Sequence, residues 1–175
     1  QRSDPMQAQI KKFLHEEKAL GEILSARVNR FGVRGAIGKR PNPMTPPKNV
    51  DYDLWLGPAQ SEPLYRNNLH YDWHWDFDTG NGDLGNQGIH QMDLCRWAMG
   101  YDRMPDRVIG YGGSFGYDDD GNTPNTLVSI LDYPEAPIIF EVRGLPSSLA
   151  AQKNNCGGSM DRYLGMSIGA AVHCE

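Results

Sequence analysis

The sequence predicts an α+β fold built around a largely antiparallel β-sheet. Two helical patterns occur in the first hundred residues, and three strand patterns then follow one another with only short turns between them. Consecutive strands joined in this way pair antiparallel, whereas regular alternation of strand and helix would predict a parallel sheet. The chain has 175 residues, of which 39% are apolar, so we expect one folded unit with a core of its own.

Composition and charge exclude several classes of protein. The formal net charge is −5, which disfavours sequence-independent binding of nucleic acid, because that binding needs a basic surface. No stretch reaches the roughly 18 to 20 apolar residues that a membrane span requires, so no membrane association is expected. The start of the chain has no basic region followed by an apolar one, so no signal peptide is expected in these residues. The compartment cannot be read from the sequence.

The first helix is predicted to begin after the capping residue Asp4, with Pro5 at its first position, and to end near Gly21. Its apolar residues at helical spacing are Ile10, Phe13, Leu14 and Leu20. A strand is expected over residues 22–31. An extended loop follows over residues 38–50, which contain four prolines. The basic residues between Arg27 and Arg40 are interpreted as lying on a solvated strand and loop.

A second helix is expected from about Asp83 to Met99, and Gly100 ends it. Strands are predicted over 107–115, 125–133 and 138–143, and a tight hairpin connection, Pro134 to Pro137, joins the last two. The glycines between Gly110 and Gly116 are interpreted as bulges in a strand, since they do not lie between a strand and a helix as a phosphate-binding loop would.

The tail from Ala151 to Glu175 differs in composition from the rest. Its apolar end, residues 163–172, fits either a short helix or a strand, and the tail also fits a poorly ordered terminus. Cys156 and Cys174 could pair, whereas Cys95 lies among apolar helix residues and is expected to be buried as a small hydrophobe.

The second helix carries the strongest chemical signal. Asn86, His90, Asp93 and Trp97 are four, three and four residues apart, so they share one face of the helix. A histidine beside a carboxylate can be held in one tautomer and used as a general acid or base. The same spacing also suits a structural histidine, and spacing alone leaves both interpretations open.

Other patterns predict less. His70 and His74, together with His90, lack a defined carboxylate ligand, so no metal site is expected. The run Asp118 to Asn122 lacks the glutamate that would complete a calcium loop, and it is interpreted as a solvated turn. The aromatic-rich segment from Trp55 to Phe77 could stack on a sugar or a nucleobase, or could pack in the core.

Several segments, in the same order, resemble the Gfo/Idh/MocA family of oxidoreductases. The segment Gly82-Asp83-Leu84-Gly85-Asn86-Gln87-Gly88-Ile89-His90-Gln91-Met92-Asp93 resembles the family's catalytic-helix motif. Residues 51–59, 122–126 and 140–145 resemble flanking segments of the same domain. The resemblance covers about residues 1–150, while residues 151–175 form a divergent tail that does not resemble the family's continuation, so the sheet is expected to end early and leave an open edge.

The resemblance implies the second of the family's two domains, an open and mostly antiparallel sheet with helices packed on one face and oligomer contacts through the other. The family's first domain is a Rossmann domain that binds NAD or NADP, and no Gly-x-Gly-x-x-Gly that opens a βαβ unit is found here. The cofactor-binding residues are therefore unknown, and the isolated chain is not expected to bind NAD or NADP tightly. Expected partners are further copies of the chain, a Rossmann domain and a small carbohydrate or polyol.

Residue roles implied by the resemblance are as follows. His90 matches the family's catalytic histidine, Asn86 stands where many members have an acid, and Asp93 matches an acid that orients or supports the site. A substrate-side segment is matched by His70, Trp73 and His74, and Arg143 lies in a matching motif with an open role.

The function expected from the resemblance is that of the substrate-binding and oligomerisation domain of an NAD(P)-dependent sugar or cyclitol dehydrogenase, inactive without a Rossmann domain. The alternative is a free-standing binding or assembly module, or an inactive gene fragment, that self-associates through its open sheet.

Overall fold

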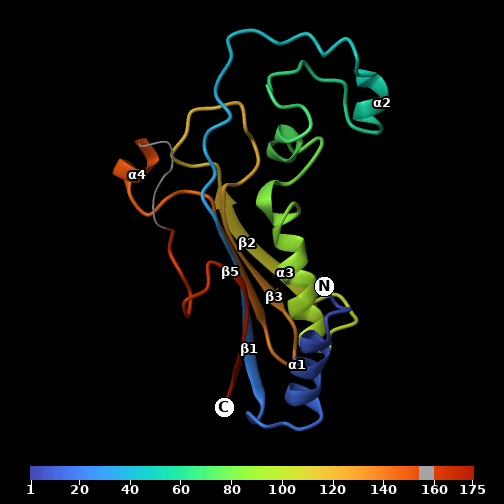
Figure 1. The fold of residues 1–175 in the computed structure, drawn as a ribbon, viewed down its shortest axis with the longest axis vertical. Coiled ribbons are helices and arrows are strands. Elements are labelled where there is room, and N and C mark those ends of the chain that lie inside the picture. Colours follow the sequence, from blue (N-terminus) through green and yellow to red (C-terminus); the bar gives the residue numbers. More distant parts are fainter. Residues whose placement is uncertain (154–159) are drawn as a thin grey trace.

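The computed structural model describes residues 1–153 and 160–175. One face of a five-stranded sheet carries the longer helices, and long loops extend beyond one end of the sheet (Figure 1). The elements are α1 (Pro5–His15), β1 (Ile23–Phe31), α2 (Tyr52–Leu56), η1 (Asp72–Trp75), η2 (Gly82–Leu84), α3 (Gly88–Ala98), β2 (Arg107–Gly113), β3 (Thr126–Asp132), β4 (Ile138–Arg143), α4 (Leu149–Lys153) and β5 (Ile168–Cys174).

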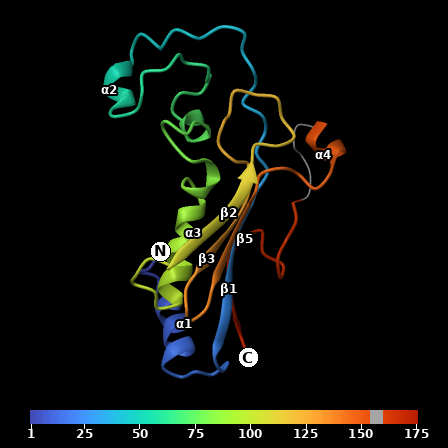
Figure 2. The same cartoon turned by 180° about the vertical axis from the view of Figure 1, so that it is seen from behind.

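The strand order is β2-β3-β4-β1-β5, and only the β1–β4 pair is parallel. The predicted α+β class with an open, mostly antiparallel sheet is therefore confirmed. α3 packs against β1 and β5, and α1 packs against α3 (Figures 1 and 2). Among the described residues, no helix is long and apolar enough to cross a bilayer.

The tail contributes a strand, so the expectation that the sheet ends early is wrong. β5 pairs antiparallel with β1, from Ile23 opposite Cys174 to Arg30 opposite Ile168. It satisfies the backbone groups of β1 that would otherwise form an exposed edge. The proposed pairing of Cys156 with Cys174 falls on a residue outside the described ranges.

The predicted bulges in the glycine-rich strand are also wrong. β2 pairs with β3 in unbroken register from Arg107 opposite Asp132 to Gly113 opposite Thr126. A Cβ on Gly112 would lie 2.3 Å from the carbonyl oxygen of Thr126, so this glycine permits close approach of the two strands.

Both helices are shorter than predicted. α1 begins after the Asp4 cap, whose carboxylate accepts from the Met6 N–H, but it ends at His15 rather than near Gly21. α3 begins at Gly88, because the preceding residues form the separate 3-10 turn η2. Gly100 has a positive φ of 77° and ends α3 as expected.

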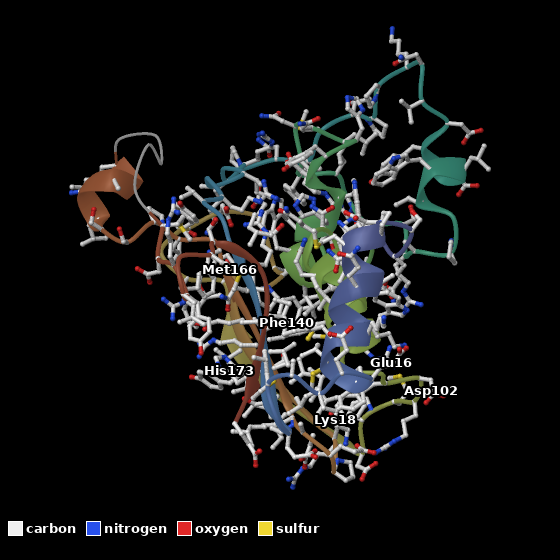
Figure 3. All side chains as sticks on the ribbon, turned by 60° about the horizontal axis from the view of Figure 1, so that its bottom comes forward. Glu16, Lys18, Asp102, Phe140, Met166 and His173 are labelled. Carbon is white, nitrogen blue, oxygen red and sulfur yellow. The ribbon has the colours of Figure 1, made fainter. Side chains whose placement is uncertain are left out.

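The core lies between the sheet and α3. It is built from the inward side chains of β1 and β4 together with the inner face of α3. Phe140 lies between the sheet and the helices, whereas Met166 and His173 lie on the other side (Figure 3). Cys95 is 1% exposed, and burial raises the pKa of its thiol to about 12, so it is a buried hydrophobe as predicted.

Candidate functional site

Close backbone packing fixes the start of α3 on the sheet. A Cβ on Gly88 would lie 2.4 Å from the ring of Phe140 and 2.8 Å from the carbonyl oxygen of Asp83. Only glycine allows this approach, which packs the first turn of the helix against the ring of Phe140 from β4. The position of Asn86 and His90 relative to the sheet follows from this contact.

His90 projects from the first turn of α3 and is exposed, and Asn86, one turn earlier, is half-buried. Within the described ranges, no residue forms a hydrogen bond or ion pair with either side chain. The imidazole of His90 is accessible to a ligand, and Asn86, in the turn that precedes α3, carries an amide that can hydrogen-bond a hydroxyl.

Asp93 contacts the start of the chain. Its two carboxylate oxygens accept from Arg2, at 2.9 Å from Nε and 2.5 Å from Nη2. This bidentate pair holds the start of the chain on α3. Two contacts join α1 itself to α3: His15 Nε2 lies 2.6 Å from the Ala98 carbonyl oxygen, and Lys11 lies over the Trp97 ring.

A buried ion cluster lies directly before α3. Asp83 is completely buried, and its carboxylate accepts from Arg34 Nε and Nη2, each at 3.0 Å. Arg30, 2% exposed, lies 3.4 Å from the same carboxylate, and burial lowers the pKa of this guanidinium while the charge of Asp83 opposes the shift. The interpretation of the 27–40 basic cluster as solvated is therefore wrong for Arg30.

Gly80, Gly82 and Gly85 have the spacing of a dinucleotide-binding loop, but their surroundings differ. The element before them is the 3-10 helix η1, not a strand, and the loop holds the buried Asp83. A Cβ on Gly80 would lie 2.6 Å from the backbone of His74, and Gly82 has a φ of +69°. These glycines serve local packing, and the segment lacks the strand–loop–helix context that holds a pyrophosphate.

The three residues of the aromatic segment that were predicted to lie on the substrate side differ in exposure. His70 is exposed, Trp73 is half-buried, and His74 is 1% exposed. His74 Nδ1 lies 2.5 Å from the Tyr71 carbonyl oxygen, and burial lowers the pKa of the imidazole, so the neutral ring donates from Nδ1. Its Nε2 has no hydrogen-bond partner in the described part of the chain.

Arg143 is not part of the same site. By strand alternation from Phe140 and Val142, its side chain lies on the sheet face away from α3. Its Nε donates to Glu141 at 2.5 Å, and Nη1 pairs with Asp161. The structure thus separates Arg143 from His90 by the thickness of the sheet.

The ion cluster around Asp83 was missed by the sequence analysis. The sequence features that could have revealed it are Asp83 in a glycine-rich segment and two arginines, Arg30 and Arg34, at the end of a predicted strand. The aspartate lies about fifty residues after the arginines. No cluster of three or more histidine, cysteine, aspartate or glutamate side chains suited to a metal occurs among the residues that the structure describes.

A family model described as the C-terminal α/β domain of the oxidoreductase family, within the Gfo/Idh/MocA group, matches residues 10–110. This match covers more than half of the chain. The chain belongs to the Gfo/Idh/MocA C-terminal domain family. A search of curated proteins finds no match.

Solved structures agree on the fold. GenD2 from gentamicin A biosynthesis, solved with NAD, is 19% identical with a TM-score of 0.52, over 84% of this chain and 32% of that one. The WlbA dehydrogenase from Bordetella pertussis, solved with NADH and UDP-GlcNAcA, is 19% identical with a TM-score of 0.51, over 83% and 34%. The chain spans about a third of each relative, and at this identity the likeness establishes the fold alone.

Proposed function

We propose that this Gfo/Idh/MocA domain is the substrate-binding and oligomerisation part of an NAD(P)-dependent sugar or cyclitol dehydrogenase, inactive without a dinucleotide-binding domain. The observation that supports this most strongly is the exposed imidazole of His90, which has no partner in the described chain and lies one turn from Asn86. The glycine loop before α3 lacks the context of a dinucleotide site, which supports a cofactor domain elsewhere.

In this proposal His90 accepts the proton of a substrate hydroxyl, and Asn86 orients that hydroxyl by hydrogen bonding. Asp93 has an indirect role in this proposal, because its carboxylate is paired with Arg2, which precedes α1. NAD or NADP, bound by another domain, would accept the hydride. Without that domain nothing positions the acceptor, so the isolated chain is expected to turn over no substrate.

The oligomerisation part of the proposal rests on the sheet face away from α3. Strand alternation places an apolar group of β2 and β3 there: Ile109 at 47% exposed, Tyr111 at 84%, Val128 at 39% and Ile130 at 38%. A contiguous exposed apolar patch on a sheet face marks an interaction surface. This patch equally supports the alternative of a self-associating module without activity.

The proposed role of His90 is tested by the NMR signals of the five histidines. The His90 imidazole, assigned with a His90→Gln variant, is expected to shift on addition of glucose or myo-inositol. Asn86→Ala should weaken that response, because it removes the amide that orients the hydroxyl. A His90 signal that is unaffected by any hexose or cyclitol would contradict the substrate-binding role.

A further inference from the structure

A second concave site lies beside α2, away from α3. It has a volume of about 350 Å³, within the range of roughly 300 to 1,000 Å³ typical of small-molecule sites. We call it the Trp55–Trp73 groove, and its lining residues are Trp55, Leu56, Pro58, Ala59, Trp73, Asp78 and Thr79. No residue of α3 lines it, so it is separate from the surface around His90.

Both indoles of the groove are held in place by their neighbours. The ring of Tyr52 stacks on Trp55 with centroids 5.7 Å apart and planes inclined by 9°. Trp73 contacts His74 edge-on at 5.4 Å, and Gly80 approaches its ring so closely that a Cβ would lie 3.2 Å away. Both indoles nevertheless remain half-exposed. Rigid, partly exposed aromatic faces offer contact area at low entropic cost.

The polar groups of the groove carry net negative charge. Asp78 is exposed, and its carboxylate has no partner among the described residues. The neighbouring Asp76 is neutralised by Arg66, whose Nη1 lies 2.6 Å from Oδ2. Thr79 donates its hydroxyl proton to the Trp73 carbonyl oxygen at 2.6 Å. No lysine or arginine lines the groove, and the Arg66 guanidinium, 3.4 Å from the Thr79 hydroxyl oxygen, is paired with Asp76. The carboxylate of Asp78 is therefore the unpaired charge of the groove.

We propose that the Trp55–Trp73 groove binds a saccharide that carries no negative charge. The C–H face of a pyranose ring packs against an indole, and its hydroxyls donate to a carboxylate acceptor. A nucleotide would also stack on the indoles, but its phosphates would meet the unpaired carboxylate of Asp78, whereas the neighbouring Arg66 guanidinium is already paired with Asp76. Aromatic surface together with an unpaired carboxylate therefore selects a sugar over a nucleotide.

The test follows the assigned indole N–H signals of the full chain during titration with methyl glucoside, glucosamine, glucuronate and UMP. Methyl glucoside and glucosamine are expected to shift the Trp55 and Trp73 signals in a saturable way. Glucuronate and UMP are expected to bind at least about tenfold more weakly. No saturable shift with methyl glucoside, or equal binding of the anionic ligands, would overturn the proposal.

Variants separate the groove from other sites. Trp55→Ala is expected to abolish the response, and Asp78→Asn to reduce the discrimination against glucuronate without removing sugar binding. Leu54→Ala is the matched control, because Leu54 lies on the same helix, is 79% exposed and does not line the groove. Sugar shifts that survive Trp55→Ala would contradict the assignment. The His90 signal reports separately on the proposed dehydrogenase role. The experiment can therefore refute saccharide binding in the groove without refuting the role of His90, and the reverse.

Discussion

Asp83 and Arg34 form a bidentate ion pair, with both hydrogen bonds at 3.0 Å, between the end of β1 and the turn that precedes α3. Arg34 also donates to the Tyr71 hydroxyl at 2.8 Å and accepts, through its backbone oxygen, from the Tyr117 hydroxyl. One guanidinium thus joins the segment after β1, the turn before α3 and the aromatic segment.

Asp83→Ala is expected to destabilise the protein by about 3 to 5 kcal/mol, because it leaves the buried charge of Arg30 uncompensated. Asp83→Asn keeps the volume and should cost less, with the same sign. The measurement is urea denaturation followed by tryptophan fluorescence. Asp118→Ala is the control, since the pair of Asp118 with Lys39 lies on the surface and its loss should not be measurable. A loss below about 1 kcal/mol for Asp83→Ala would contradict the structural role of the cluster.

Stability should depend on pH through His74. Burial lowers the pKa of this imidazole below its ordinary value of 6.5 in the folded state. The unfolded chain therefore binds more protons than the folded protein at pH values between the two pKa values. The contribution of His74 to the free energy of unfolding is complete above about pH 6.5 and is lost as the pH falls from there towards the folded-state pKa.

Denaturation midpoints between about pH 7.5 and pH 5.5 measure this effect. His74→Asn removes the titrating group and keeps a donor for the Tyr71 carbonyl, so it should flatten the profile. His70→Gln, in the same segment but exposed, should leave the slope unchanged. A slope that persists in His74→Asn would mean that another group carries the dependence.

His90→Ala should leave the free energy of unfolding unchanged within about 0.5 kcal/mol, because the side chain is exposed and has no partner in the described chain. His74→Ala provides the contrast, since it removes a buried ring packed against three aromatic neighbours and should cost more than about 2 kcal/mol. Thermal denaturation of both variants distinguishes the two histidines. A large loss in His90→Ala would assign His90 a structural role.

The apolar patch of β2 and β3 is expected to mediate self-association. Light scattering at about 10 μM should show a dimer or larger species if the patch supports micromolar affinity. Ile109→Lys with Ile130→Lys should give a monomer, because two charges would be buried in the contact. Leu54→Lys is the control at an exposed apolar site elsewhere. A wild-type chain that remains monomeric would refute this role.

The fold was predictable where patterns are local. β4 matches its predicted limits, 138–143, because the turn between Pro134 and Pro137 limits its start and its residues are strongly strand-forming. For β5, a strand was one of the two interpretations left open for 163–172, but its pairing was not predictable, because its partner β1 lies about 140 residues earlier. Local pattern cannot reveal a pairing at that separation.

The candidate site was predictable in part. Helical spacing placed Asn86, His90 and Asp93 on one helix face; the structure keeps His90 and Asp93 on α3 but leaves Asn86 in the turn that precedes it. Spacing could not show that Asp93 binds Arg2, since the two residues are 91 positions apart. It also could not tell which of His70 and His74 is buried, because the intervening residues form no regular helix that would define a face.

A titration of the purified chain with NADH and NADPH tests the central claim most directly. Binding is followed by tryptophan fluorescence and by nicotinamide emission, with Trp97 on α3 as a nearby reporter. The account predicts no saturable binding up to about 1 mM, equivalent to a binding free energy weaker than about −4 kcal/mol. Saturable binding at micromolar concentration would contradict it, and would mean that this domain holds a dinucleotide on its own.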